Sequence, residues 1–350
     1  MKESRPVQAV RLGDKLVGPG QPCYVIAEIG GNFETLEDGR RLIDLAMQCG
    51  CDAVKLQTFR ADTITSRKAM FNMENTGIAS QWEHFRKYEL SKEIHAKLFD
   101  CARQKGLFFF STPSHESDVD LLEEIGVGAH KIGSDDAANP QFLRYAARTG
   151  KPVLLSTGMC TLDEVKDAVS AIEETGNRQL ILFHCTTNYP THLESVNLRA
   201  MQTMQETFDY PVGYSDHTLG IDVCYAAAVL GAPILEFHFT SDKQGSGPDH
   251  MLSKDPLETA LLVKKLKDLP VLLGDGIKRP ASSEAETRRN NRKSLVLTAD
   301  FPKGSLLTRE GVAVKRPGYG IAPADLEKVI ERKAARDLKA EDILAWDDLA

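Results

Sequence analysis

The sequence has no apolar stretch of the roughly 18 residues that a membrane-spanning helix needs. Its first ten residues, MKESRPVQAV, also lack the apolar segment of a secretory signal peptide. Long runs of lysine and arginine are missing as well, and the net charge of −7 disfavours binding to nucleic acid or to an anionic membrane. We therefore expect a cytoplasmic protein with small-molecule substrates and with neither nucleic acid nor membrane as a partner.

Cysteine is sparse, and the seven cysteines are odd in number. Most of them lie in apolar stretches, which predicts reduced, buried thiols rather than disulfides. Cys49 and Cys51 have neither zinc-finger nor thioredoxin spacing, so we attribute them to packing. A glycine-rich phosphate loop is also absent, because GPGQP and GDGIKRP have neither its spacing nor its strand-to-helix setting.

What the sequence does contain is a regular alternation of strand-like and helix-like segments between residues 23 and 274. The eight strand-like segments are CYVIAEI (23–29), CDAVKLQT (51–58), LFFFSTP (107–113), AHKIGS (129–134), PVLLSTG (152–158), QLILFHCT (179–186), PVGYSDH (211–217) and ILEFHFT (234–240). Helical patterns with apolar residues at three- and four-residue spacing separate them. Eight such units in about 250 residues predict an α/β fold of the TIM (β/α)8 barrel type, with a doubly wound sheet as the alternative.

Segments outside this alternation define the predicted domain organisation. Residues 9–22 contain two short β-like runs around Gly-Asp, which favours a hairpin that plugs the N-terminal end of the barrel. The segment from Arg60 to Leu90 is too long for an ordinary loop, and its aromatic residues predict an ordered lid. We place the barrel domain at 1–275, a polar linker at 276–293 and a small domain of short strands at 294–350.

The segment ILEFHFT carries Glu236 and His238 among apolar residues. A period of two puts Leu235, Phe237 and Phe239 on one face and the two polar side chains on the other. For a strand in isolation, an edge position with the polar face in water explains the pattern. In a barrel, however, the C-terminal strand ends meet at the catalytic face, which favours a functional site.

Polar side chains end every predicted strand. They are Glu28, Lys55, Gln57, Ser111, Thr112, Lys131, Ser134, Ser156, Thr157, His184, Thr186, Thr187, Ser215, Asp216, His217, Glu236 and His238. Charges gathered in a cleft are costly to desolvate, so they predict a bound ligand or metal. Lys55 and Lys131, with the hydroxyls near them, would hold a small multiply charged anion. Alternatively, each lysine pairs with Glu28 or Asp136 as part of the barrel structure.

His217 and His238 end adjacent predicted strands, so their rings would lie near each other. Two neutral imidazoles suit a divalent transition metal, with oxygens of carboxylate, water or substrate completing the coordination. The alternative is a pair of core histidines hydrogen-bonded to Asp216 and Glu236. The residues alone leave both interpretations open.

Nine short motifs follow one another along the chain: IAEIGGN, KLQT, STP, KIGS, LSTGM, HCTTNYP, GYSDHT, LEFHFT and GPDH. In this order and on these strand ends, they resemble the sialic acid (N-acetylneuraminate) synthase family, including the branch labelled spore coat polysaccharide biosynthesis protein E. The C-terminal segment with KRPGYGI resembles that family's antifreeze-like (SAF, β-clip) domain. The resemblance covers nearly the whole chain from residue 20 onward.

The resemblance implies a transferase that condenses phosphoenolpyruvate with an N-acetylhexosamine-type aldose. The products would be a nonulosonic acid and phosphate, for the biosynthesis of a surface polysaccharide. It also implies a divalent metal cofactor, Mn²⁺ or Mg²⁺, and a domain-exchanged homodimer in which the small domain of one chain caps the barrel of the other.

Residues that match the family's motifs carry the expected roles. Phosphoenolpyruvate would contact Lys55, Thr112, Lys131, Ser134, Ser156, Thr187 and Ser215. The sugar would contact Gln57, Tyr189, Asp249 and, from the small domain, Arg316. His217 and His238 would bind the metal, and the catalytic groups would be these two histidines with Glu28 and Glu236.

The sequence departs from the family's usual pattern in several places. Phe33 replaces the histidine of an Asn-His pair, and Asp135 and Asp136 replace Gly-Glu. Phe237 stands where arginine is usual, although the alternation turns it away from the barrel interior. The family's phosphate-facing asparagine falls on Thr187. These departures bear on the acceptor sugar more than on the reaction.

Two other functions are compatible with the barrel architecture. One is a different metal-dependent barrel enzyme, such as a pyruvate aldolase, which would ignore phosphoenolpyruvate. The other is a non-catalytic carbohydrate-binding relative. The presence of both lysines, both histidines and Glu28 argues against a decayed site.

Overall fold

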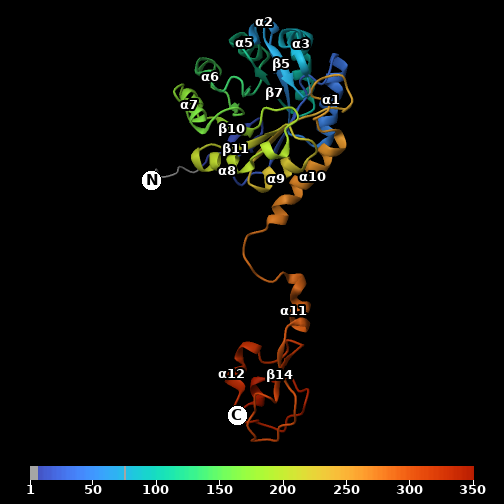
Figure 1. Ribbon diagram of the computed structural model, residues 1–350, viewed down its shortest axis with the longest axis vertical. Coiled ribbons are helices and arrows are strands. Elements are labelled where there is room, and N and C mark those ends of the chain that lie inside the picture. Colours follow the sequence, from blue (N-terminus) through green and yellow to red (C-terminus); the bar gives the residue numbers. More distant parts are fainter. Residues whose placement is uncertain (1–6, 75) are drawn as a thin grey trace. The chain divides into compact units, whose positions relative to one another are not determined.

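The computed structural model describes residues 7–74 and 76–350. Residues 1–6 and 75, which belong to the predicted barrel domain and lid, lie outside the described residues. The chain divides after Leu273 into two compact units, both drawn in Figure 1, and each is described by itself.

The first unit is a closed barrel of eight parallel strands, as the alternation predicts. The strands are β3 (Tyr24–Glu28), β4 (Ala53–Thr58), β7 (Phe108–Pro113), β8 (His130–Ile132), β9 (Val153–Ser156), β10 (Leu180–Cys185), β11 (Val212–Asp216) and β12 (Ile234–His238). They follow one another around the barrel in chain order, and β12 closes it by pairing with β3. The doubly wound alternative is therefore wrong. An edge position for ILEFHFT is wrong too, because β12 pairs with a strand on each side.

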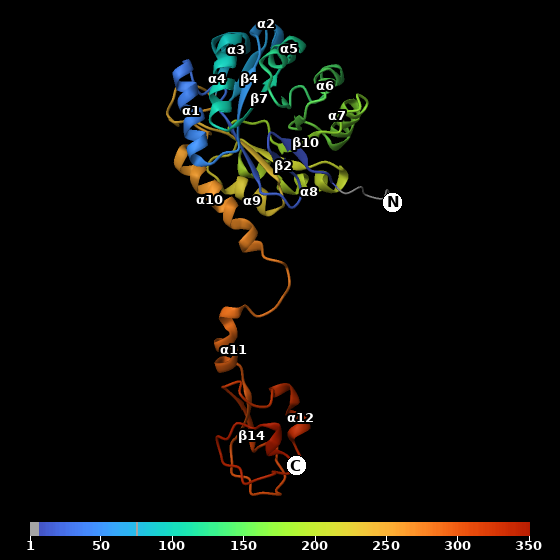
Figure 2. The ribbon, with the colours of Figure 1, turned by 180° about the vertical axis from the view of Figure 1, so that it is seen from behind.

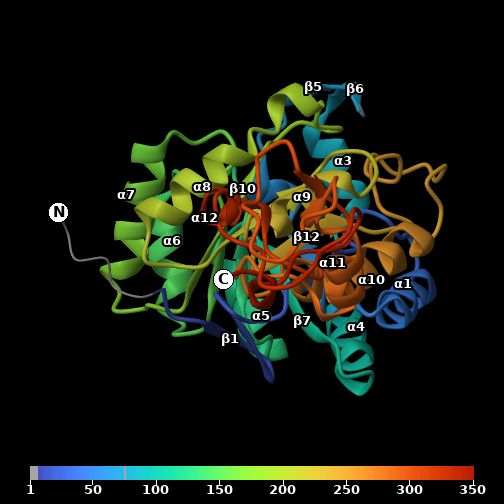
Figure 3. The same ribbon diagram turned by 90° about the horizontal axis from the view of Figure 1, so that it is seen from below.

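Helices surround the barrel. They are α1 (Leu36–Cys49), α4 (Lys92–Gln104), α5 (Glu116–Ile125), α6 (Pro140–Ala147), α7 (Leu162–Glu173), α8 (Leu198–Thr207), α9 (Asp222–Val229) and α10 (Pro256–Leu273), with a short 3₁₀ turn at Leu193–Ser195. Figure 3 shows α1, α4, α5, α6 and α7 at the periphery of the strands. The hydroxyls of Ser91 and Thr161 accept main-chain N–H groups in the first turns of α4 and α7, which stabilises the start of each helix. Within the described residues, every helix is too short or too polar to cross a membrane.

Alternation along the strands separates two apolar cores. Phe237 and Phe239 pack outward in the core between the barrel and its helices. Ile234 belongs instead to the core inside the barrel. Side chains of one strand alternate between these two sides, so Glu236 and His238 point into the barrel, and Phe237 points away from it as predicted.

An apolar hairpin closes the N-terminal end of the barrel. Strand β1 (Val10–Leu12) pairs antiparallel with β2 (Lys15–Val17). Val10, Leu12 and Val17 are buried in the core inside the barrel. This end of the barrel is therefore filled with apolar side chains, and the polar strand ends lie at the opposite end.

The predicted lid is an ordered segment over residues 60–74 and 76–90. It contains α2 (Ala61–Ile64), the hairpin of β5 (Met70–Met73) and β6 (Gly77–Ser80), and α3 (Gln81–Tyr88). The elements lie together at one edge of the barrel in Figures 1 and 3. Phe85 of α3 contacts Phe59 and Phe71 edge to face, with ring centroids 5.0 and 5.7 Å apart. The aromatic residues that predict an ordered lid thus pack it.

The second unit begins with residues 274–293, all of which are exposed. They contain a 3₁₀ turn at Ser282–Glu284 and the short helix α11 (Ala285–Asn291), and Figure 2 shows the extended chain that precedes this helix. Further elements are β13 (Ser294–Leu297), which pairs antiparallel with β14 (Val312–Lys315), α12 (Leu326–Val329), and 3₁₀ turns at Pro323–Asp325 and Trp346–Asp348. The unit has an apolar core of its own, separate from the two cores of the barrel.

Candidate active site

Four charged side chains meet inside the C-terminal end of the barrel. Glu28, Lys55, Lys131 and Glu236 come from β3, β4, β8 and β12, and none is more than 5% exposed. Lys55 forms an ion pair with Glu28. The Oε1 atom of Glu236 lies 3.5 Å from Lys55 Nζ and 3.4 Å from Lys131 Nζ. These four residues are called the mouth cluster below, and in it one carboxylate bridges two ammonium groups.

The two carboxylates of the mouth cluster differ in acidity. Burial raises the pKa of Glu28, although Lys55 opposes the shift. Burial acts on Glu236 in the same direction, but Lys131 and Lys55 outweigh it and lower the pKa of this carboxyl. Burial also lowers the pKa of Lys131. Carboxylates whose pKa values are pushed apart are a common arrangement in acid/base sites.

Hydroxyl groups complete the polar lining of the barrel. The contacts run from Lys55 Nζ to Thr112 Oγ1 (3.1 Å), from Lys131 Nζ to Ser156 Oγ (2.5 Å) and from Ser215 Oγ to Glu236 Oε1 (3.3 Å). The structure therefore brings together both lysines and three of the hydroxyls that the sequence assigns to an anion. Of the two structural partners considered, Glu28 pairs with Lys55, whereas the carboxylate beside Lys131 is that of Glu236.

Ser134 and Thr187 meet at Gly158, just after β9. The Gly158 N–H donates to Ser134 Oγ at 3.0 Å. A β-carbon on Gly158 would lie 2.2 Å from Thr187 Oγ1 and 2.8 Å from Ser134 Oγ, so the close approach requires glycine. Thr187 Oγ1 is buried and has no hydrogen-bond partner in the described part of the chain. A buried hydroxyl in this condition is a candidate for binding a ligand.

His217 and His238 lie next to each other, with ring centroids 5.4 Å apart. His217 Nδ1 lies 2.8 Å from the carbonyl oxygen of Thr186, so this nitrogen carries the proton and Nε2 keeps its lone pair. Burial lowers the pKa of His217, and burial together with His217 holds the pKa of His238 well below its usual range. The partner of His217 is a main-chain carbonyl rather than Asp216, which disfavours the core-histidine alternative.

The two neutral imidazoles fit the nitrogen ligands of a divalent metal. His238 Nδ1 is buried and forms no hydrogen bond within the described residues, and Asp249 Oδ2 lies 3.4 Å from it. Residues 7–74 and 76–350 contain no group of three or more His, Cys, Asp or Glu side chains that would close a coordination shell. Oxygens of substrate or water would have to fill the remaining positions.

Two predicted sugar contacts lie beside the imidazoles. The ring of Tyr189 is centred 4.3 Å from that of His217 and 6.1 Å from that of His238. Burial, with a further contribution from Glu28, raises the pKa of Asp249 to about 7. An aromatic face and a carboxyl group thus border the same side of the site.

A cavity of about 210 Å³ opens beside Gln57, the third predicted sugar contact on the barrel. Its wall includes Gly30, Phe33 and Phe59. The Gly30 N–H donates to Glu28 Oε1 at 2.5 Å, which links the cavity to the mouth cluster. Phe33, which departs from the family pattern, is therefore an apolar wall of a cavity that adjoins the site.

The remaining predicted positions lie farther out. Asp135 is exposed, and Asp136 accepts a hydrogen bond from Asn139 Nδ2 at 3.1 Å. Burial and the neighbouring Asp135 raise the pKa of Asp136 to about 6. Arg316 is an exposed residue of the second unit, just after β14, so it is not among the residues that the barrel brings together.

Comparisons with known proteins cover most of the chain. A model of the NeuB family matches residues 42–278, and a model of the SAF domain matches residues 292–350. The chain belongs to the NeuB family. The resemblance to sialic acid synthases and the C-terminal SAF domain, both predicted from short motifs, are thereby confirmed.

Relatives of this NeuB-family chain align over nearly their full length. It is 39% identical to N,N'-diacetyllegionaminic acid synthase from Legionella pneumophila, over 96% of this chain and 97% of the relative. It is 32% identical to human N-acetylneuraminate-9-phosphate synthase, over 97% of this chain and 96% of the relative. These relatives are synthases, so this NeuB-family chain is an enzyme of the predicted transferase type.

Solved structures agree with the assignment. A sialic acid synthetase from Leptospira borgpetersenii superposes with a TM-score of 0.72 at 32% identity, covering 80% of this chain and 95% of the other. Spore coat polysaccharide biosynthesis protein spsE from Bacillus subtilis gives 0.67 at 30% identity, covering 98% and 99%. The barrel and the small C-terminal domain are thus both features of the NeuB family.

The sequence reasoning did not single out Lys254. This lysine is 1% exposed and forms an ion pair with Asp216 at 2.7 Å, directly beside His217. Its sequence context, MLSKDPLE, looks like the start of an exposed helix. The ladder contact between Phe239 and Lys254 turns it inward, and such a contact is not visible in a single sequence.

Proposed function

We propose that this NeuB-family enzyme condenses phosphoenolpyruvate with an N-acetylhexosamine-type aldose to give a nonulosonic acid and phosphate, for a surface polysaccharide. The observation that carries the proposal is the mouth cluster itself, where two buried ammonium groups lie in the same barrel end as two neutral imidazoles. The names of the relatives, which are synthases of legionaminic acid and of N-acetylneuraminate 9-phosphate, support the product class.

Phosphoenolpyruvate would bind to Lys55, Lys131 and the hydroxyls around them. Burial lowers the pKa of Lys131, and a multiply charged anion next to it would favour its charged form. The Thr187 hydroxyl, which has no partner among the described residues, would donate to a phosphate oxygen. Ser134, Ser156, Thr112 and Ser215 would supply the other short contacts.

A divalent metal, Mn²⁺ or Mg²⁺, would be held by His217 and His238. When bound, it would supply Lewis-acid polarisation of the acceptor's carbonyl group. Tyr189 and Asp249 border these imidazoles and would orient the sugar, with Gln57 on the side of the adjoining cavity. Arg316 would complete the sugar site from the SAF domain.

The bonds change in a simple order. C3 of phosphoenolpyruvate attacks the aldehyde carbon, the aldehyde oxygen takes up a proton, and positive charge develops at C2. Water adds to C2 and gives one proton to Glu28, which makes good the proton that the aldehyde oxygen took up. The proton that remains on the C2 hydroxyl leaves with the phosphate as the bond between C2 and the bridging oxygen breaks and C2 becomes a ketone. We assign the proton to Glu28 because Glu236 lies between two ammonium groups and serves as their counter-ion.

Release of phosphate from phosphoenolpyruvate tests this reaction. With Mn²⁺ present, phosphate should appear only when an acceptor sugar is added, and ¹⁸O in the bridging position of phosphoenolpyruvate should be recovered in the phosphate. A pyruvate aldolase would turn over pyruvate and ignore phosphoenolpyruvate. A carbohydrate-binding relative would bind sugar without releasing phosphate. Either result would overturn the proposal.

A small panel of acceptors would identify the sugar. The panel contains N-acetylmannosamine, a 2,4-diacetamido hexose and a hexose without acetamido groups. The 39% identity to a legionaminic acid synthase favours the diacetamido sugar. The sugar with the highest kcat/KM in the panel is identified as the preferred acceptor. Phe33→His, which restores the family's usual residue in the cavity wall, should change the ranking of the sugars more than the rate with the preferred one.

We also propose that the enzyme works as a domain-exchanged homodimer. Among the described residues, six large apolar side chains are exposed in the loops and lid that follow the C-terminal strand ends, namely Met70, Ile78, Met159, Leu193, Leu219 and Met251. An apolar rim of this kind around a polar site is typical of a surface that another domain covers. The exposed segment 274–293 is long enough to let the SAF domain reach a second copy.

Mixed dimers test the exchange. His217→Ala and Arg316→Ala should each be inactive as homodimers. In a mixed dimer, the Arg316→Ala chain supplies an intact barrel and the His217→Ala chain supplies an intact arginine. Capping by the partner would restore one working site per mixed dimer, whereas mixed dimers as inactive as their parents would show that each SAF domain serves its own barrel.

A further inference from the structure

We propose that Lys254 is a positioning residue that fixes His217 and His238 relative to each other through its buried contact with Asp216. The inference rests on the metal site of the proposed function, but it concerns a residue with no role in that proposal. Lys254 touches both strand ends that carry the histidines, once with its main chain and once with its side chain.

The main chain of Lys254 is bonded to the end of β12. Its N–H donates to the carbonyl oxygen of His238 at 2.7 Å, and its own carbonyl accepts the N–H of Thr240 at 3.1 Å. Lys254 thus continues the ladder beside β12 on both sides of Phe239. The backbone that carries His238 is therefore held by Lys254 directly.

The side chain of Lys254 is bonded to the end of β11. Its Nζ donates to Asp216 Oδ2 at 2.7 Å and to the carbonyl oxygen of Thr218 at 2.8 Å. Asp216 Oδ1 in turn accepts the Thr218 N–H and hydroxyl at 3.0 and 2.8 Å. His217 lies between Asp216 and Thr218 in the chain, so hydrogen bonds restrain the backbone on both sides of it.

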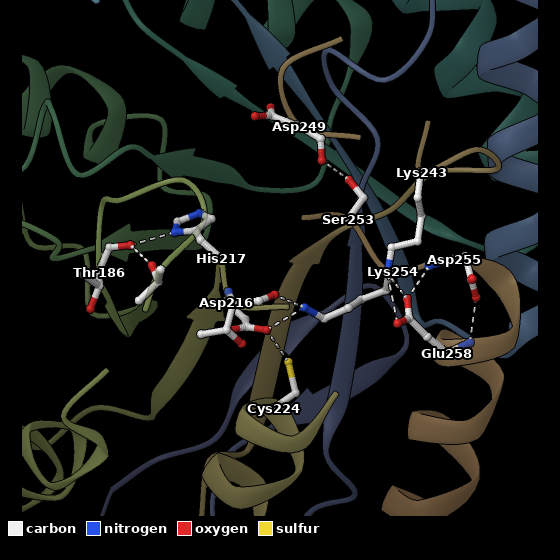
Figure 4. A network of polar contacts seen from close by, with 12 residues as sticks. Thr186, Asp216, His217, Cys224, Lys243, Asp249, Ser253, Lys254, Asp255 and Glu258 are labelled. Carbon is white, nitrogen blue, oxygen red and sulfur yellow. Dashed lines mark hydrogen bonds and ion pairs between the residues drawn. The ribbon is translucent and has the colours of Figure 1, made fainter. Parts of the chain in front are cut away.

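The network is buried and continuous. Lys254 and Asp216 are each 1% exposed, and Cys224 Sγ donates to Asp216 Oδ2 at 3.2 Å. Figure 4 shows Lys254 reaching across to Asp216, with His217 beyond it, while Lys243 and Glu258 form a separate contact. Asp216, Thr218, Cys224 and Lys254 are called the anchor network below. Through this network, the distance between the His217 and His238 side chains depends on the ammonium group of Lys254.

A nearby ion pair provides a matched control. Lys243 Nζ lies 2.9 and 2.8 Å from the two carboxylate oxygens of Glu258, in the same stretch of chain. This pair is half-buried, and its contacts with Glu258 do not involve the strand ends that carry the histidines. Lys243→Met therefore removes a lysine ion pair of the same loop without breaking the anchor network.

Binding of Mn²⁺ alone, followed by the electron paramagnetic resonance signal of the free ion, tests the inference. Lys254→Met should weaken Mn²⁺ binding at least tenfold and change the spectrum of the bound ion. Lys254→Arg, which keeps the charge, should recover part of the affinity, and Lys243→Met should stay within twofold of the parent. A folded Lys254→Met protein with parental Mn²⁺ affinity and spectrum would overturn the inference.

A second measurement needs no metal. In ¹⁵N-histidine spectra, with the signals assigned by His217→Ala and His238→Ala, both ring signals should move in Lys254→Met and stay in place in Lys243→Met. Unmoved signals in Lys254→Met would overturn the inference, whether or not the parent binds Mn²⁺. A parent protein that binds no Mn²⁺ would reject the metal of the proposed function and leave this second measurement to judge the inference. If Lys254→Met does not fold, Asp216→Asn/Lys254→Met removes both buried charges and is judged by the same two readouts.

Discussion

Two groups of buried charges lie at the C-terminal end of the barrel, and they differ in how fully their hydrogen bonds are satisfied. In the anchor network, the Asp216 carboxylate accepts four hydrogen bonds and the Lys254 ammonium group donates two. In and around the mouth cluster, Glu236 Oε2, Thr187 Oγ1 and His238 Nδ1 are buried without a hydrogen-bond partner among the described residues. Buried polar atoms are rarely left in this condition, so the difference separates a scaffold from a site that a ligand completes.

The difference also appears in the pKa values. Burial opposes the charged forms of Asp216 and Lys254, but their mutual attraction outweighs it, so the pKa of the carboxyl is lowered and that of the ammonium raised. In the mouth cluster the pKa of Glu28 is raised and that of Lys131 lowered, mainly by burial. An anionic substrate would favour the charged form of Lys131 and the neutral form of Glu28, because a nearby negative charge raises both pKa values.

The largest effect is expected at the histidines. His238→Ala should lower kcat by roughly 10³-fold or more, because loss of Lewis-acid polarisation costs several kcal/mol of transition-state stabilisation. Thermal unfolding should change little, since the anchor network holds the strand ends without this side chain. Rates of phosphate release, with and without prior removal of metal by a chelator, measure the effect. Full activity in chelator-treated enzyme would contradict the prediction.

Lys131→Ala should have the next largest effect. It removes an ammonium group from the mouth cluster, and a charged hydrogen bond contributes about 1.5 to 3 kcal/mol, so the KM for phosphoenolpyruvate should rise roughly 10- to 100-fold. The KM for the acceptor sugar should stay within about twofold. Steady-state kinetics in both substrates separate the two.

The matched control for this change is Lys151→Ala, which breaks a half-buried ion pair with Glu123 before β9, away from the site. It should leave both KM values unchanged. If Lys131→Ala raises only the KM of the sugar, the two subsites are assigned the wrong way round.

Gly158→Ala should have a smaller effect on phosphoenolpyruvate binding, because it disturbs only the surroundings of the Thr187 hydroxyl, which has no hydrogen-bond partner among the described residues. The added methyl group would lie 2.2 Å from Thr187 Oγ1, and overpacking of this kind costs about 1 to 3 kcal/mol. We expect roughly tenfold weaker binding of phosphoenolpyruvate, measured by titration. Gly158→Ala/Thr187→Ala relieves the contact with the threonine and should recover part of the affinity. A double variant as weak as the product of the two single effects would show that the clash is not the cause.

The residues of the mouth cluster and the two histidines could be predicted from the sequence, because the ends of strands are recognisable from local patterns. The eight segments, their alternation and their polar ends place Glu28, Lys55, Lys131 and Glu236 inside one barrel mouth. The family motifs then identify His217 and His238 as a pair. Period-two alternation also orients Phe237 outward.

The anchor network could not be predicted, because it depends on contacts between residues far apart in the chain. Asp216 and Lys254 are 38 residues apart, and nothing in KDPLE distinguishes a buried lysine from an exposed one. The hairpin of β5 and β6, in which Phe71 packs against Phe85, was missed as well. The sequence thus predicts which residues face the ligand better than it predicts what holds them in place.

The smallest effect concerns a third buried carboxyl group, that of Asp118 in the first turn of α5. Within the described residues it forms no ion pair with a lysine or arginine, so its pKa can be compared with that of the paired Asp216. It is 3% exposed, and its Oδ2 accepts a hydrogen bond from the Ser114 N–H at 3.3 Å. Burial raises its pKa to about 6, in contrast to Asp216, whose pKa is lowered by Lys254. Because the folded-state pKa lies above the unfolded value of about 3.9, the folded protein binds this proton more tightly. The contribution of Asp118 to stability is therefore most favourable below about pH 4 and is lost as pH rises through 6.

Asp118→Asn cannot ionise, so from pH 4 to pH 7 its free energy of unfolding should fall by about 1 to 2 kcal/mol less than that of the parent. Urea unfolding at several pH values measures the difference, and Asp120→Asn, at an exposed position of the same helix, is the control. Parallel pH profiles for parent and Asp118→Asn would mean that the carboxyl is solvated in the folded protein, and Asp118 would then no longer serve as the unpaired counterpart of the anchor network.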